Sequence, residues 1–150
     1  MKACLDFDDI LELGRPQIQE MQRIGEAYPT ADVPGASAAF TRQVRIVEGI
    51  VIQTYGVAAA LTGKSGDLNE VAEIWSRMSS FCSSAMATLS SLKHKYPHCG
   101  TPELYDMVLD YKLACDKRYR GVMEELECQK VEFPKGLFSR SLCETSSSRL

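Results

Sequence analysis

Apolar residues recur at alternating steps of three and four in three long segments, and this pattern restricts the chain to a helical fold. The pattern is complete in the third segment, at Leu68, Val71, Trp75, Met78, Cys82, Ala85, Leu89 and Leu92. It recurs in the second segment at Phe40, Val44, Val47, Val51, Thr54, Ala58 and Leu61. In the fourth segment it includes Leu104, Val108, Tyr111 and Cys115, then Tyr119, Val122 and Leu126 after one skipped position. Such spacing places apolar side chains on one face of an α-helix.

Turn and capping residues divide the chain into four helical segments. The first is interrupted by Gly14-Arg15-Pro16, which predicts a short helix over about 6–13 and a second helix from Pro16 to Pro29; a single kinked helix is the alternative. The other three segments are expected at about 36–62, 67–95 and 101–128. Asp67 followed by Glu70 is typical of a capped helix start.

These segments predict an all-α fold. Seven-residue apolar repeats favour helices that cross at about 20°, and short loops make successive helices antiparallel. We therefore expect an antiparallel up-down four-helix bundle over residues 1–130, with a broken first helix. Residues 131–150 are expected to form an extended C-terminal segment with a frayed end, which either docks on another surface or completes the molecule's own core.

Composition excludes several classes of function. The chain has 150 residues and a formal net charge of −3, without the basic stripe of a nucleic-acid-binding protein. The uncharged stretches 49–63 and 78–92 are shorter than the ~20 residues of a membrane span, so both are interpreted as buried core helices and no membrane is expected. Six cysteines without a Cys-x-x-Cys pair, and no signal sequence, indicate a reduced, cytoplasmic protein.

Small residues form a second stripe on two of the helices. Gly49, Gly56 and Gly63 lie seven residues apart and share a face with Gln53 and Ala60. The next segment carries the matching positions Ser76, Ser80, Ser83, Ala87 and Ser90. A glycine inside a helix costs about 1 kcal/mol relative to alanine, so the stripe needs a reason. The main interpretation is a close contact between the two helices within one chain; the alternatives are self-association through an outward stripe and a ligand groove.

Polar residues near this stripe offer the one candidate ligand site. Arg42, Arg45 and Glu48 share one side of the helix, and Gln53 lies in the stripe itself. These residues either line the polar end of a groove in a ligand-binding or enzymatic bundle, or form a ladder of i, i+3 ion pairs. The ladder is the simpler interpretation.

Other constellations are weaker. His94, His98 and Cys99 are the candidate metal ligands closest in sequence, but Pro97 interrupts the helix between the histidines, so no metal and no cofactor are expected. Tyrosine is enriched at interface hot spots, which makes the fourth helix a candidate docking face. Its residues, with the aromatic residues of the C-terminal segment, are Tyr105, Tyr111, Tyr119, Phe133 and Phe138. The chain is thus expected to be a non-enzymatic module that binds a protein partner or itself.

Overall fold

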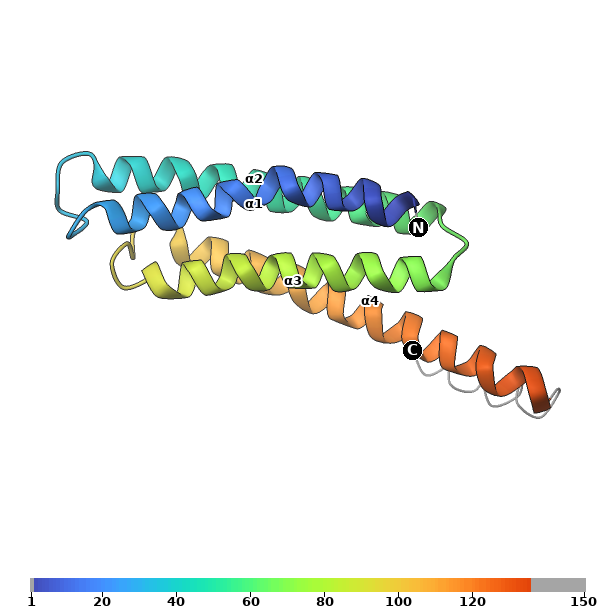
Figure 1. Cartoon of the computed structure of the whole chain (residues 1–150). Coiled ribbons are helices and arrows are strands. Elements are labelled where there is room, and N and C mark those ends of the chain that lie inside the picture. Colours follow the sequence, from blue (N-terminus) through green and yellow to red (C-terminus); the bar gives the residue numbers. More distant parts are fainter. Residues whose placement is uncertain (1, 136–150) are drawn as a thin grey trace.

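The computed structural model describes residues 2–135, which form four long α-helices joined by short loops (Figure 1). The helices are α1 (Lys2–Ala27), α2 (Ala36–Lys64), α3 (Leu68–Leu92) and α4 (Thr101–Lys135). These residues contain no β-strand. The predicted all-helical fold with four helical segments is therefore confirmed.

The first helix is continuous, and the break expected at Gly14-Arg15-Pro16 is wrong. Pro16 lies inside α1. A proline within a helix leaves the carbonyl four residues earlier without its helical donor, and here that carbonyl belongs to Glu12. Both Pro16 and Glu12 are exposed, so this side of the helix is open to water, which lowers the cost of the lost hydrogen bond.

The fourth helix extends further than the sequence suggested. It continues to Lys135, so the prediction of an extended segment is wrong for residues 131–135. The residues between Glu124 and Glu132 are mostly strong helix formers, without glycine or proline, and nothing in them ends the helix near Cys128. The remainder of the C-terminal segment lies outside the described residues.

Two glycines and one aspartate define the helix starts. Gly35 and Gly100 precede α2 and α4 with φ angles of 84° and 82°, a backbone region that favours glycine. The predicted cap at Asp67 is confirmed: its carboxylate accepts hydrogen bonds from the backbone N–H groups of Asn69 at 3.0 Å and Glu70 at 3.4 Å. A residue just before each of α2, α3 and α4 therefore explains where that helix begins.

The apolar stripes form the core, as their spacing predicted. All members of the third-segment pattern are buried except Leu68, and all members of the second except Leu61 are buried too. On α4 the burial decreases along the helix: Leu104, Val108 and Cys115 are buried, whereas Tyr119 and Val122 are only half-buried. The C-terminal half of α4 therefore contributes less to the core than its N-terminal half.

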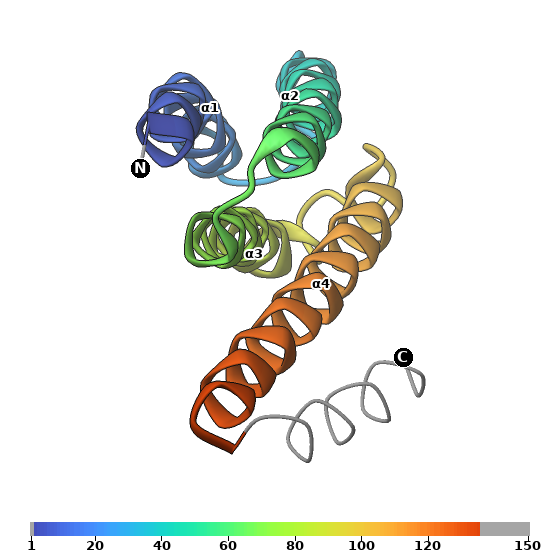
Figure 2. The same ribbon diagram turned by 90° about the vertical axis from the view of Figure 1, so that its right-hand side faces the viewer.

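The helices do not form a square of four neighbours. Seen from its end, the molecule has α1, α2 and α3 at the corners of a triangle, and α4 crosses α3 at an inclined angle (Figure 2). Helix α3 contacts each of the other three, whereas α1 and α4 have no contact within the described residues. Contacts of Gly14 with Ile50 and of Gln17 with Gln43 show that α1 and α2 run in opposite directions.

Close packing of α1 on α3 explains this arrangement. A Cβ built on Gly14 would lie 2.9 Å from Phe81 Cζ, and one built on Gly25 would lie 2.5 Å from Leu92 Cδ1. The missing side chains let α1 approach α3 across what would be the diagonal of a square bundle. α1 thus packs directly on α3 as well as on α2.

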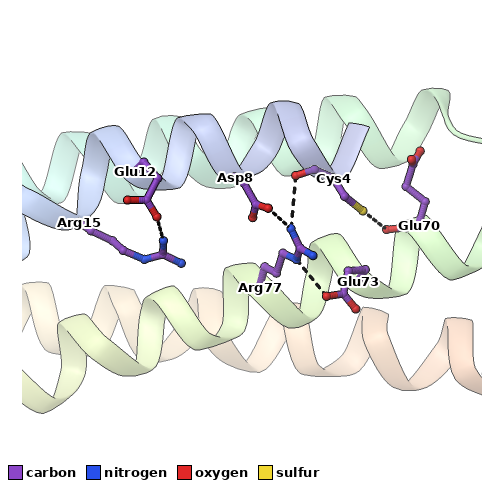
Figure 3. Close-up of polar contacts among 7 residues, drawn as sticks. All are labelled: Cys4, Asp8, Glu12, Arg15, Glu70, Glu73 and Arg77. Carbon is purple, nitrogen blue, oxygen red and sulfur yellow. Dashed lines mark hydrogen bonds and ion pairs between the residues drawn. The ribbon is translucent and has the colours of Figure 1, made fainter. Parts of the chain in front are cut away.

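An ion pair near the start of α1 adds to this contact. The Arg77 guanidinium on α3 donates to the Asp8 carboxylate on α1 and, at 3.0 Å, to Glu73 on its own helix (Figure 3). Hydrogen bonds to Asp8 and Glu73 raise the pKa of Arg77. These contacts fix the position of α1 along α3.

Candidate interaction surface on α1 and α2

An apolar groove of about 480 Å³ lies between α1 and α2. It is lined by Ile10, Leu13, Gly14, Ile50, Gln53, Thr54, Gly56, Val57 and Ala60. Leu13 borders the groove with 74% of its surface exposed, far more than a core leucine. Ile46 lies one helical turn before Ile50 and is 41% exposed. Large apolar side chains therefore remain open to water around this groove.

The glycine stripe of α2 lies on its outer surface and not between helices. A Cβ built on Gly49, Gly56 or Gly63 would meet nothing within 4 Å. All three glycines are exposed, and so are the predicted matching positions Ser76, Ser80 and Ser83 on α3. The main interpretation, a close contact of the two stripes within one chain, is therefore wrong. Each helix instead turns its apolar stripe to the core and its small residues to solvent.

The close-packed glycines are Gly14 and Gly25, which the sequence interpretation missed. A signal for them exists, because the sequence Phe7, Leu11, Gly14, Ile18, Met21 and Gly25 repeats at the same alternating steps as the other core stripes. Gly14 was instead interpreted as part of a helix break. Continuing the apolar period through the proline would have placed both glycines in the core.

The polar residues near the stripe are exposed. Arg42, Arg45 and Glu48 all lie on the surface of α2, and no ion pair joins them within residues 2–135. The predicted ladder is thus not seen. None of the three lines the groove between α1 and α2 or either of two other surface cavities, whereas Gln53 lines the groove.

The tyrosines of α4 pack on the molecule's own core. The centroid of the Tyr111 ring lies 4.6 Å from the centroid of the Tyr55 ring. The Tyr55 centroid in turn lies 5.6 Å from that of Trp75. Tyr105 and Tyr119 are half-buried against the same core. Half-burial leaves part of each ring open to solvent, so the docking role of these residues stays a prediction. The side chain of Phe133 and all of Phe138 lie outside the described part of the chain.

The two histidines and Cys99 line a second cavity, of about 470 Å³, between the loops at one end of the bundle. Both histidines are exposed, and the buried Cys99 thiol contacts the Ser37 carbonyl at 3.7 Å. Within the described residues, no group of three or more His, Cys, Asp or Glu side chains is arranged to hold a metal ion. Near this cavity, Lys95 donates to the Gly25 carbonyl at 2.6 Å, and so neutralises the C-terminal end of α1.

The cysteines in the described part of the chain are free. Burial raises the pKa of both Cys82, on α3, and Cys115, on α4, to about 12. A thiol reacts as its thiolate, so these two cysteines behave as small apolar residues between the helices.

Helix α2 is the most apolar of the four. An 18-residue window within it has a mean hydropathy of 1.4, so α2 is long and apolar enough to cross a membrane by length and composition. Core helices of soluble proteins can pass the same test. Only 28% of that window is buried, whereas the sequence predicted that this part of α2 would be a buried core helix. Much of the apolar surface of α2 is therefore not covered by residues 2–135.

No family model, curated protein or solved structure matches this chain. The surface of the molecule is therefore the guide to its function.

Proposed function

We propose that this protein is an antiparallel up-down helical bundle that acts as a non-enzymatic interaction module, with the groove between α1 and α2 as its docking surface. The observation that carries the proposal is the combination of open glycines and exposed apolar side chains around one groove. Gly49 and Gly56 lower the helix propensity of α2, although a side chain at either position would meet nothing in the described part of the chain. A partner backbone that packs against the bare stripe supplies the missing reason for them.

The apolar side chains and the charged residues around the groove support a protein partner. Exposed apolar surface rimmed by polar residues is typical of protein interaction sites, and here Leu13 and Ile46 lie beside charged residues of α1 and α2. An apolar side chain of a partner that enters the groove would be shielded from water by Ile10 and Val57. Ligand binding around Arg42, Arg45 and Glu48 has no comparable support, since they line none of the cavities described above.

A fluorescent probe in the groove tests this function. Leu13→Cys, made in a chain that also carries Cys128→Ser and Cys143→Ser, is labelled with an environment-sensitive dye. We expect the emission to shift to the blue when the labelled protein is mixed either with concentrated unlabelled protein or with an extract of its native cells. The same dye on Lys117→Cys, an exposed position on α4, is the matched control and should not respond.

Competition shows whether the signal is specific to the groove. Unlabelled wild-type protein should produce the shift when it is added alone, whereas unlabelled Gly56→Leu should not, because its added side chain blocks the stripe. If the shift comes only with the extract, an excess of unlabelled wild-type protein should reverse it and an excess of Gly56→Leu should not. If the dye at position 13 keeps its water-exposed emission in both mixtures, the groove is not a docking surface and the proposed function is wrong.

A further inference from the structure

Exposed charges of opposite sign lie on the surface that contains the groove. Asp6 and Asp9 are exposed near the start of α1, and Arg42 and Arg45 are exposed near the start of α2. Because α1 and α2 run in opposite directions, the acidic and the basic pairs lie at different levels along the helices, on opposite sides of Gly49. None of the four forms an ion pair with another residue of 4–129, the range whose side chains the structure describes. We refer to this surface, the groove with these four residues and Gly49, as the α1–α2 face.

The charged residues lie on the same side as the groove. Asp6, Asp9 and Leu13 follow one another at steps of three and four, which keeps them on one side of α1. Arg42, Arg45 and Gly49 have the same spacing on α2. The charges therefore border the groove and do not lie on the far side of either helix.

The register of the two helices places Gly49 at the centre of the charge pattern. Gly14 packs against Ile50, and the Gln43 amide donates to Gln17 at 2.9 Å. Extending these contacts along two antiparallel helices, which each rise ~1.5 Å per residue, puts Asp9 level with roughly residues 51–55 of α2. Gly49 lies midway between that level and Arg45.

We propose that the partner of the α1–α2 face is a second copy of this chain, related by a two-fold axis that passes close to Gly49. This inference rests on the proposed function and names the partner of the same site. A two-fold interface brings one surface patch against itself, so Arg45 of each copy meets Asp9 of the other, and Arg42 meets Asp6. The two-fold rotation therefore pairs the acidic and basic residues on both sides of Gly49.

The apolar parts of the face fit the same rotation. Ile46 and Gln53 lie on opposite sides of Gly49 along α2, so the exposed Ile46 of one copy reaches the mouth of the other copy's groove, beside Leu13. The bare backbone at Gly49 allows the two α2 helices to cross closely. Gly56 leaves room for the long arginine side chain that reaches the partner's acidic end. A lipid surface fits less well, because it would bury Asp6 and Asp9 without a counter-charge.

Charge reversal tests the pairing. By light scattering, the wild-type protein should reach twice the 16.7 kDa mass of one chain as its concentration rises. We expect Asp9→Arg and Arg45→Asp each to weaken the dimer by about tenfold or more at low salt, because the two-fold axis repeats every like-charge contact. Glu124→Arg, at an exposed position on α4, is the control and should dimerise as the wild type does.

Mixing the two weakened variants gives the decisive readout. In a dimer of one Asp9→Arg chain and one Arg45→Asp chain, both contacts join opposite charges again, so the equimolar mixture should recover the dimer. The double variant Asp9→Arg/Arg45→Asp should recover it as well. Thermal unfolding of each variant alone checks that the exposed substitutions leave the fold intact.

Several results would overturn the second copy as partner. These are a monomer at all concentrations, a dimer insensitive to both reversals, a mixture that stays monomeric, or binding to phosphatidylcholine vesicles in place of dimerisation. If the protein stays monomeric while the dye at position 13 responds to the extract, the partner is a different protein. The interaction function then stands and this inference fails. If neither experiment responds, both are wrong.

Discussion

At the scale of single residues, the glycines of this chain serve two different purposes. Gly14 and Gly25 lie in the core and allow α1 to approach α3, because a Cβ at either position would collide with Phe81 or Leu92. Gly49 and Gly56 face open solvent. The same residue type therefore supports the fold on α1 and leaves a bare surface on α2.

Alanine substitutions should separate the two kinds of glycine. Gly14→Ala forces the Phe81 ring and Ile50 to move, and overpacking costs about 1–3 kcal/mol, which exceeds the gain in helix propensity. Gly56→Ala meets nothing and should raise the free energy of unfolding by up to about 1 kcal/mol. Urea unfolding at concentrations where the chain is monomeric measures both. A loss of stability in Gly56→Ala would show that this glycine has a contact within its own chain.

At the scale of helices, the contact between α3 and α4 depends on a polar cluster as well as on its apolar stripe. The Ser79 hydroxyl on α3 donates to Asp116 on α4 at 2.6 Å, and Lys112 donates to the same carboxylate at 2.7 Å. Burial raises the pKa of Asp116, but the hydrogen bonds from Lys112 and Ser79 outweigh it and hold the pKa below its ordinary value of 3.8. The carboxylate form of Asp116 is therefore favoured in the folded state.

This shift makes the α3–α4 contact sensitive to acid. Since the pKa of Asp116 is lower in the folded than in the unfolded chain, its contribution is complete above the unfolded value and is lost as the pH falls through the folded one. Asp116→Asn should lower the free energy of unfolding by up to about 1 kcal/mol at pH 6 and by less in strong acid. Asp110→Asn, exposed on the same helix, is the control. An equal effect of Asp116→Asn at both pH values in urea unfolding would argue against the charged contact.

The sequence predicted the core of these elements better than their ends. The apolar period identified the buried positions of α2 and α3, and Asp67 was correctly expected to cap α3. The continuity of α1 was missed because the cost of Pro16 depends on whether water reaches the freed carbonyl, and local sequence does not reveal this. The outward direction of the glycine stripe could have been predicted from the sequence. Val51 in the apolar stripe and Gly56 in the glycine stripe lie roughly 140° apart around a helix, so the two stripes cannot both face the core.

At the scale of the molecule, α3 is the central helix. It contacts every other helix, whereas α4 extends past the bundle (Figure 1) and has no buried residue between Tyr119 and Gln129. The sequence did not predict this asymmetry, because the repeat on α4 continues through Tyr119, Val122 and Leu126 without indicating which of them has a neighbour to pack against. The position of the groove between α1 and α2 was missed for a similar reason, because it forms where two helices meet.

Hydrogen exchange should show this asymmetry directly. Amides of α3 between Met78 and Leu89 are expected to exchange only on global unfolding, because every partner of α3 must separate first. Amides of α4 beyond Val122 should exchange fastest among the helical ones. Mass spectrometry of the dilute protein at neutral pH measures both. Slow exchange beyond Val122 would show that a further surface covers the end of α4.

The two classes of glycine also determine how this sequence can diverge. Unless a partner packs on them, Gly49, Gly56 and Gly63 can be replaced with a gain in helix stability, whereas replacing Gly14 or Gly25 requires compensating changes at Phe81 or Leu92. Selection on the fold and selection on the proposed interface would therefore act on separate positions of one residue type. In a set of related sequences, retention of the α2 glycines would date the proposed interface independently of the fold.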